Sequence, residues 1–187
     1  MTRNDILEAA AQVFRQKGFH GASMADIAGA VNLQKASLYH HVSGKQEILL
    51  SLLDRALEML TEHISAVTSL DLPPDQKLRQ MVRAYLTALT DNMDLASVLL
   101  MEHRSLEPTL HARHVPNRDR FERLWQDVVK QGVAAGIFVC DDPGLTVRAL
   151  MGIMNWTITW FRPAGAKSIG QISDAYADLL FHGLLAG

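Results

Sequence analysis

The chain has 187 residues, of which 48% are apolar and 20% charged, so it can bury a sizeable core and is not a wholly disordered chain. Its net charge of −2 excludes a strongly basic protein, so any surface that binds nucleic acid has to be local. Cys140 is the only cysteine, which excludes an internal disulfide and favours a cytoplasmic location. We expect no secretory signal, because Asp5 and Glu8 precede any long apolar run, and no membrane span, because the apolar stretch 149–161 is too short.

The first 45 residues predict three short helices. Apolar residues recur at helical spacing over residues 6–14, and Gly18 is expected to end that helix. Ser23 is a suitable N-cap for the second helix. Asn32 is expected to adopt the positive φ that the following turn needs. The third helix is predicted over residues 34–41, and two short helices joined by a tight turn indicate a helix-turn-helix.

The rest of the chain is also predicted to be helical. Apolar residues at helical spacing indicate six further helices, over residues 48–64, 78–89, 94–105, 121–136, 143–161 and 169–185. Pro73 and Pro74 mark a connection, and Pro108 and Pro116 are expected to bracket a polar loop. No alternating strand pattern with hairpin turns is present. The sequence therefore predicts an all-α fold of about nine helices.

The predicted third helix carries side chains suited to the major groove of DNA. Gln34 and Lys35 can hydrogen-bond base edges, and Ala36 allows close approach to a base. Tyr39 and Lys45 are suited to phosphate oxygens. The residues predicted to contact DNA are Ser23, Gln34, Lys35, Ala36, Ser37, Tyr39, His40 and Lys45. The residues alone leave a second interpretation open, in which the unit is a structural element that binds no DNA.

Histidines between residues 103 and 114 suggest a metal site that we expect to be absent. His111 and His114 are spaced so that their imidazoles are near each other on a helix, and His103 and Glu107 are near in sequence. The stretch lies between prolines, however, and no matching second pair of ligands appears. We therefore predict no bound metal.

An enzyme is the alternative from a different class. It would need a nucleophile, and Cys140 precedes Asp141 and Asp142, whose negative charge is expected to disfavour the thiolate and weaken it as a nucleophile. No Ser-His-Asp motif and no glycine loop for phosphate is visible. We expect no enzyme and no cofactor, with an all-helical thioester enzyme as the remote alternative.

A longer pattern runs through the N-terminal residues. In chain order it consists of Phe14, Gly18-Phe19, Ser23, Ile27-Ala28, Leu38-Tyr39-His40-His41-Val42 and Lys45. This pattern covers about the first 50 residues and resembles the TetR family of bacterial transcriptional regulators. The resemblance implies that residues 1–46 form a three-helix domain that binds double-stranded DNA.

The pattern departs from that family at a few positions. Val42 replaces the usual Phe behind the recognition helix, and Asn32 replaces a common turn glycine. Gln34 and Ala36 stand where Ser or Thr and Gly are frequent. The last two positions bear on which bases are read.

The family resemblance also implies a homodimer and a ligand cavity in residues 47–187. In that family the last two helices of each protomer pair into a four-helix bundle, and ligand binding changes the separation of the two DNA-reading heads. The helices predicted over 143–161 and 169–185 are apolar, and Ala149, Gly152 and Gly183 would allow close approach. The residues alone also allow these to be central core helices.

A weaker similarity, at Asn155-Trp156, at 160–163 and in the closing 172–184 segment, is to the TetR-like regulators that respond to acyl-coenzyme A thioesters in lipid or sterol breakdown. A small hydrophobic effector of this kind needs an apolar tunnel and cations for its phosphates. The residues expected to contact it are Met93, Leu99, Met101, Arg104, Arg120, Phe121, Trp125, Met154, Asn155, Trp156 and Arg162. A Met and Trp stripe also fits ordinary core packing, or a sensor of drugs or aromatic metabolites.

The leading hypothesis is a ligand-responsive transcriptional repressor. As a dimer it would bind a pseudo-palindromic operator, and it would not bind membranes.

Overall fold

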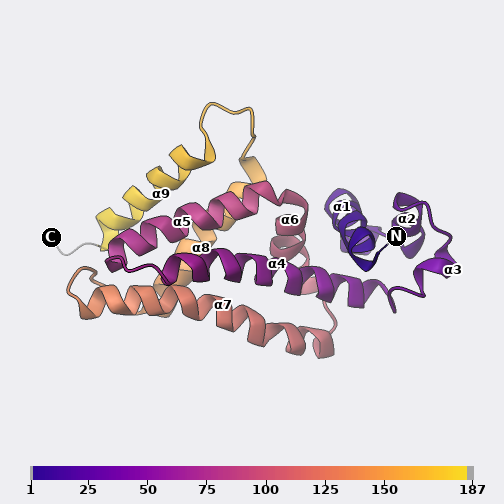
Figure 1. The fold of residues 1–187 in the computed structure, drawn as a ribbon, viewed down its shortest axis with the longest axis horizontal. Coiled ribbons are helices and arrows are strands. Elements are labelled where there is room, and N and C mark those ends of the chain that lie inside the picture. The colour runs from indigo at the N-terminus through magenta and orange to yellow at the C-terminus, as the bar shows by residue number, and fades with distance from the viewer. Residues whose placement is uncertain (1, 185–187) are drawn as a thin grey trace. The chain divides into compact units, whose positions relative to one another are not determined.

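The computed structural model describes residues 2–184, which form helices and no β-strand (Figure 1). In chain order the elements are α1 (Arg3–Gly21), α2 (Met24–Ala30), α3 (Lys35–Leu38), α4 (Lys45–Thr68), α5 (Pro74–Asp91), α6 (Met93–Glu102), the 3₁₀ turn η1 (His103–Ser105), α7 (Pro108–Ala134), α8 (Pro143–Trp160) and α9 (Ile169–Leu184). The predicted all-α fold is confirmed, with nine α-helices in the described range. The outermost residues of the two predicted domains, Met1 and 185–187, lie outside the described residues.

The chain folds into two compact units. The first combines Met1–Glu58 with Asn92–Arg118, and the second combines Met59–Asp91 with Asp119–Gly187. α4 and α7 therefore each contribute to both units. The functional boundary expected between residues 46 and 47 stays a prediction.

The first unit begins with helices whose starts are fixed by capping bonds. Thr2 and Ser23 each accept a hydrogen bond from the backbone N–H three residues later, so α1 and α2 begin with a complete capping box. Gly18 interrupts α1 with a φ of 71°, which glycine adopts without strain, and the helix resumes as far as Gly21. Asn32 has the expected positive φ, at 54°. α1 packs against α2 and α6, and α2 packs against α3.

Segments that are distant in sequence complete the first unit. Arg15 of α1 forms an ion pair of 2.7 Å with Asp94 of α6. The side-chain amide of Gln46, at the start of α4, donates to the Ser105 carbonyl at 2.9 Å and accepts from the Glu107 N–H at 3.1 Å. A single side chain therefore holds the connection between α6 and α7 beside the start of α4.

α7 corrects the prediction of a polar loop. Pro108 begins the helix and Pro116 lies inside it, so no loop separates the two prolines. A proline inside a helix removes one backbone hydrogen bond. Here His114 is buried with its Nδ1 2.9 Å from Asp54 Oδ1, and the Asn117 side chain donates to the same oxygen at 3.0 Å. These contacts with α4 stabilise the helix where the prolines predicted a break.

The second unit is built around α5, which packs against α8 and α9. Leu78, Val82 and Leu86 of α5 have no exposed surface. The last turn of α7 approaches Phe138 closely, because a Cβ added at Gly132 would lie 2.0 Å from the Phe138 ring, so glycine is needed there. Within residues 2–184, no helix combines the length and the apolar content that a membrane span needs.

Candidate functional site

α3 presents a polar face around one buried anchor. Leu38 has no exposed surface, whereas Gln34, Lys35 and Ala36 are exposed. Tyr39 keeps 48% of its surface exposed, although it is a large aromatic residue next to the core. The buried leucine therefore fixes the segment, and its polar neighbours face away from the packing.

The α-helix of this segment is shorter than expected. α3 spans Lys35–Leu38, so the predicted span 34–41 is too long. The His40 N–H donates to the Ser37 carbonyl at 3.2 Å, three residues back, and this tighter spacing begins a turn instead of another α-helical turn. His40 is exposed and Ser37 is half-buried.

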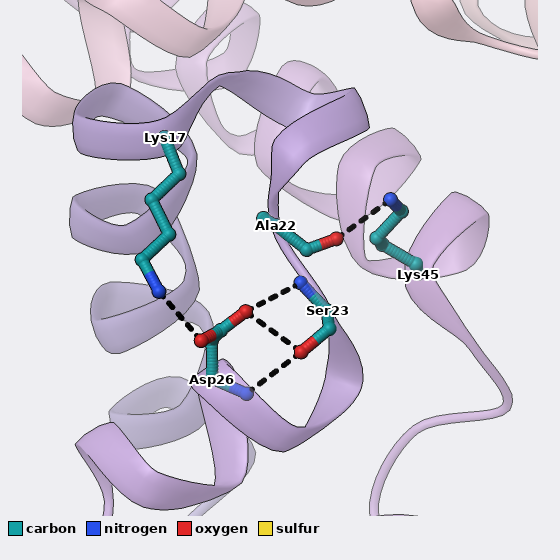
Figure 2. Close-up of polar contacts among 5 residues, drawn as sticks. All are labelled: Lys17, Ala22, Ser23, Asp26 and Lys45. Carbon is teal, nitrogen blue, oxygen red and sulfur yellow. Dashed lines mark hydrogen bonds and ion pairs between the residues drawn. The ribbon is translucent and has the colours of Figure 1, made fainter.

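Ser23 is engaged in the capping box at the start of α2 (Figure 2). Its hydroxyl accepts from the Asp26 N–H at 3.1 Å and donates to the Asp26 carboxylate at 2.7 Å. Lys17 of α1 forms an ion pair with the same carboxylate. The Lys17 bond and the Ser23 bonds lower the pKa of Asp26 below its ordinary value. The Ser23 hydroxyl, predicted to contact DNA, therefore already has a charged partner within the protein.

Lys45 also has partners inside the protein. Its Nζ donates to the Phe19 carbonyl at 2.7 Å and to the Ala22 carbonyl at 2.8 Å, the second of which Figure 2 draws. The same Nζ lies 4.4 Å from the centre of the Phe19 ring. Two of its three N–H groups are thus used to hold the start of α4 to the α1–α2 connection, a role that the sequence did not indicate.

The exposed residues around α3 have their polar groups available. Within the described residues, the side chains of Gln34, Lys35 and Tyr39 form no hydrogen bond or ion pair. An amide offers both donors and an acceptor, an ammonium offers charge, and a phenol offers one hydroxyl. This set can bond base edges and phosphate oxygens.

In the second unit, the structure brings together part of the expected effector set. Phe121 and Trp125 of α7 and Asn155 of α8 gather around Tyr85 of α5, whose ring is 5.9 Å from Phe121 and 5.7 Å from Trp125. The Tyr85 hydroxyl donates to Asn155 Oδ1 at 2.6 Å, and burial raises the pKa of Tyr85 above its usual value. Sequence reasoning missed Tyr85, although a tyrosine on an apolar stripe needs a partner for its hydroxyl.

Other residues expected at the effector are not in this cluster. Met154 is fully buried, but Trp156 is 66% exposed and Arg162 is exposed. In the first unit, Leu99 is buried and Met93 is half-buried, whereas Met101 and Arg104 are exposed. Arg120 is exposed as well. The large exposed surface of Trp156 is unusual for an indole and indicates a surface role.

His114 of α7 is buried against Asp54, whereas His103 of η1 and His111 of α7 are half-buried. No group of three or more His, Cys, Asp or Glu side chains in residues 2–184 could hold a metal ion. Burial and the neighbouring Arg104 lower the pKa of His103, and this favours a neutral ring.

Comparison with known proteins gives two family matches along the chain. Residues 6–52 match the model described as bacterial regulatory proteins, tetR family. Residues 71–184 match the model described as tetracyclin repressor-like, C-terminal domain. The HTH-type transcriptional repressor KstR2 of Mycobacterium tuberculosis (strain ATCC 25618 / H37Rv) is 26% identical over 184 residues, covering 97% of this chain and 92% of KstR2.

Solved structures agree with these matches. The TetR family transcriptional regulator PfmR from Thermus thermophilus is 34% identical with a TM-score of 0.87, covering 97% of this chain and 99% of PfmR. AibR, in complex with isovaleryl coenzyme A and operator DNA, is 26% identical with a TM-score of 0.89, covering 96% of this chain and 97% of AibR. Because one family model covers more than half of the chain and the other covers the N-terminal helices, the chain belongs to the TetR family of bacterial transcriptional regulators.

Proposed function

We propose that the protein is a cytoplasmic, dimeric transcriptional repressor that a small hydrophobic effector releases from a pseudo-palindromic operator. Regulators of the TetR family bind operator DNA and a small-molecule effector, usually as dimers. The observation that carries the proposal is the set of exposed, unengaged polar side chains beside the buried Leu38. In this proposal residues 1–46 bind DNA, and residues 47–187 bind the effector and the second protomer.

In the proposed complex, the exposed face of α3 contacts both the bases and the phosphate backbone of the DNA. Gln34 and Lys35 bond base edges, and Ala36 lets the helix approach them closely. Tyr39 bonds a phosphate oxygen through its hydroxyl. His40 and Ser37 flank this contact, and Ser23 lies at the start of the neighbouring helix. Lys45 acts on DNA binding through the fold of these helices, because its ammonium is held by the Phe19 and Ala22 carbonyls.

The experiment is a fluorescence anisotropy titration with DNA from upstream of the protein's own reading frame. Gln34→Ala should cost about 1–3 kcal/mol at one base position and relax the preference there, because it removes a base contact. Lys35→Ala should likewise cost about 1–3 kcal/mol and relax the preference at the base that Lys35 contacts, because it removes a second base contact. Lys167→Ala removes the same charge from the second unit and is the control. Unchanged binding in both α3 variants would show that α3 does not read DNA.

The dimer is supported by an apolar stripe on the surface of α8. Leu145, Ile153, Trp156 and Trp160 keep between 39% and 66% of their surface exposed. Their spacing places them on one side of the helix. A Cβ at Gly152, on the same side, would meet nothing within 4 Å, so a second backbone can approach. An apolar face of this size marks an interaction site, and a second copy of the chain is the proposed occupant.

A route for the effector signal is present in the first unit. Arg15 joins α1 to α6, and Gln46 joins the start of α4 to the α6–α7 connection. A ligand that shifts α6 or the start of α7 therefore changes the setting of the DNA-reading helices. We propose that this shift alters the separation of the two heads and releases the operator.

We propose an acyl-coenzyme A thioester as the effector class. AibR, with which this chain shares 26% identity, was solved with isovaleryl coenzyme A. A thermal-shift screen should find stabilisation by acyl-coenzyme A thioesters that exceeds stabilisation by free fatty acids or cationic dyes at equal concentration, because a ligand that binds the folded state stabilises it more as its affinity rises. Stabilisation by the dyes alone would favour the drug or aromatic-metabolite sensor instead.

A further inference from the structure

The indole N–H of Trp125 is a buried hydrogen-bond donor without an acceptor. Trp125 has no exposed surface, and its Nε1 is the one buried side-chain nitrogen or oxygen within residues 2–184 that has no hydrogen-bond partner. Buried donors are nearly always paired, because an unmade hydrogen bond lowers stability. The described residues therefore provide no hydrogen-bond acceptor for the Trp125 indole N–H.

The hydroxyl of Tyr85, whose ring contacts Trp125, already has a hydrogen-bond partner. The Tyr85 hydroxyl donates to Asn155 Oδ1 at 2.6 Å, and the Tyr85 and Trp125 rings meet edge to face with centres 5.7 Å apart. Phe121 stacks on Tyr85 with a centre distance of 5.9 Å. Side chains from α5, α7 and α8 thus form one aromatic cluster, in which the indole N–H alone is unpaired.

The missing acceptor should be uncharged. Trp125 and Tyr85 are enclosed by protein, and a buried site disfavours a negative charge. The same burial raises the pKa of the Tyr85 hydroxyl above its usual value. A carboxylate brought beside Trp125 would meet the same penalty. A carbonyl oxygen accepts a hydrogen bond without charge, and it is common on molecules that are otherwise apolar.

We propose that Trp125 donates its Nε1–H to a carbonyl oxygen of the effector, which is therefore an apolar molecule bearing a thioester or ketone. The inference rests on the proposed function, because it specifies the effector of the same regulator. Trp125 has no exposed surface, so the ligand reaches it by displacing apolar side chains between α5, α7 and α8. Binding at this donor is thus coupled to a rearrangement of three helices.

The test uses ligands in matched pairs that differ only in the carbonyl group. Isovaleryl and decanoyl coenzyme A are each paired with the S-alkyl thioether in which CH2 replaces the carbonyl, and a steroid ketone is paired with its deoxy hydrocarbon. The carbonyl member should bind about tenfold more tightly, the value expected for one buried hydrogen bond. The thioester and ketone arms distinguish the two sources of the carbonyl.

Nuclear magnetic resonance reports the bond directly. With 15N-labelled tryptophan the full-length protein gives three indole N–H signals, from Trp125, Trp156 and Trp160, which are assigned by single Trp→Phe substitutions. A carbonyl ligand should move the Trp125 proton downfield, whereas its carbonyl-free partner should not. Trp125→Phe should remove the preference within each pair, and Trp160→Phe should retain it.

The outcomes separate this inference from the proposed function. Equal affinity within every pair, binding without a downfield Trp125 shift, or binding by no member of the panel would overturn the carbonyl contact. If Trp125→Phe does not fold, as judged by its thermal unfolding, the signals of the unsubstituted protein decide the question. Failure of the ligand-free protein to bind its operator would instead refute the proposed function and leave the indole result standing.

Discussion

The ammonium group of Lys45 links three parts of the DNA-binding head. It bonds the carbonyls of Phe19 and Ala22 and lies over the Phe19 ring, so the start of α4 is tied to the end of α1 and to the connection before α2. Gly18 contributes to this arrangement, because its positive φ bends the chain immediately before Phe19, whose carbonyl bonds Lys45. The residue therefore positions the head, and its charge is used inside the protein.

Replacing Lys45 should reduce stability more than replacing another lysine of the head. Lys45→Met keeps an apolar stem but removes two hydrogen bonds and the charge over the Phe19 ring, so the free energy of unfolding should fall by about 1–3 kcal/mol. Urea denaturation measures the change. The exposed Lys35→Met should stay within about 0.5 kcal/mol of the unsubstituted protein. Equal stability of the two variants would assign Lys45 a different role.

Asp26 should make the stability of the head depend on pH. Its pKa is lowered in the folded state by Lys17 and Ser23, so the ionised carboxylate stabilises the fold. This stabilisation is complete above the ordinary value of 3.8 and declines as the pH falls from there toward the lowered folded-state pKa. Asp26→Asn should therefore be less stable than the unsubstituted protein at pH 7, and the difference should shrink below about pH 4.

Thermal unfolding monitored by circular dichroism between acidic and neutral pH checks this expectation. Asp71→Asn, at an exposed position, is the control and should change little. A constant difference between Asp26→Asn and the unsubstituted protein at all pH values would show that the Asp26 charge is not the cause.

α7 is a continuous helix that passes through Pro116, because contacts with α4 stabilise it on both sides of the proline. His114 and Asn117 both bond Asp54 of α4, on either side of the proline. Asp54 is half-buried and His114 is almost fully buried, so the bonds are partly shielded from water. The helix thus depends on a carboxylate about sixty residues earlier in the chain.

Removing the Asp54 carboxylate should destabilise α7. Asp54→Ala leaves the buried His114 ring without its acceptor and should lower the free energy of unfolding by about 1–3 kcal/mol. Asp54→Asn keeps one oxygen as an acceptor and should cost less. Amide hydrogen exchange should show faster exchange near Pro116 in Asp54→Ala. Unchanged exchange there would mean that the helix persists for another reason.

Local chemistry predicted the elements that depend on neighbours in sequence. The Ser23 cap, the positive φ of Asn32 and the starts of α8 and α9 follow from residues within one or two helical turns, and these predictions are confirmed. The predicted end of the last helix, at residue 185, lies outside the described residues. Pro116 and Lys45 differ, because their surroundings come from Asp54 and Phe19, which are remote in the chain. A proline in the sequence does not indicate contacts with residues as remote as these.

The same distinction applies to the candidate site. The exposed face of α3 follows from helical periodicity around Leu38. The Tyr85–Asn155 bond joins residues 70 positions apart, so no local pattern contains it. For Trp156, a hydrophobic residue type suggested a buried ligand contact, whereas the fold leaves it 66% exposed. Composition gives the residue types of residues 47–187, and only the packing says which of them face inward.

At the scale of the whole molecule, the exposed stripe on α8 predicts how the protein associates. Trp156→Glu places a charge in the centre of the proposed dimer face and should shift the protein to monomers in analytical ultracentrifugation, with an affinity loss of at least about 2 kcal/mol. Operator binding should weaken as well, because one head per protomer then binds alone. Leu70→Glu, at an exposed leucine between α4 and α5, should remain dimeric. A dimeric Trp156→Glu protein would place the interface elsewhere.

The unequal exposure of the three tryptophans has an optical consequence. Trp125 is shielded from water, while Trp156 and Trp160 are 66% and 44% exposed in a single protomer. Indoles in water emit at longer wavelengths than shielded indoles. The tryptophan fluorescence maximum should therefore shift to longer wavelength when dilution separates the protomers of the proposed dimer. Intrinsic emission against concentration can therefore gauge self-association with no added dye.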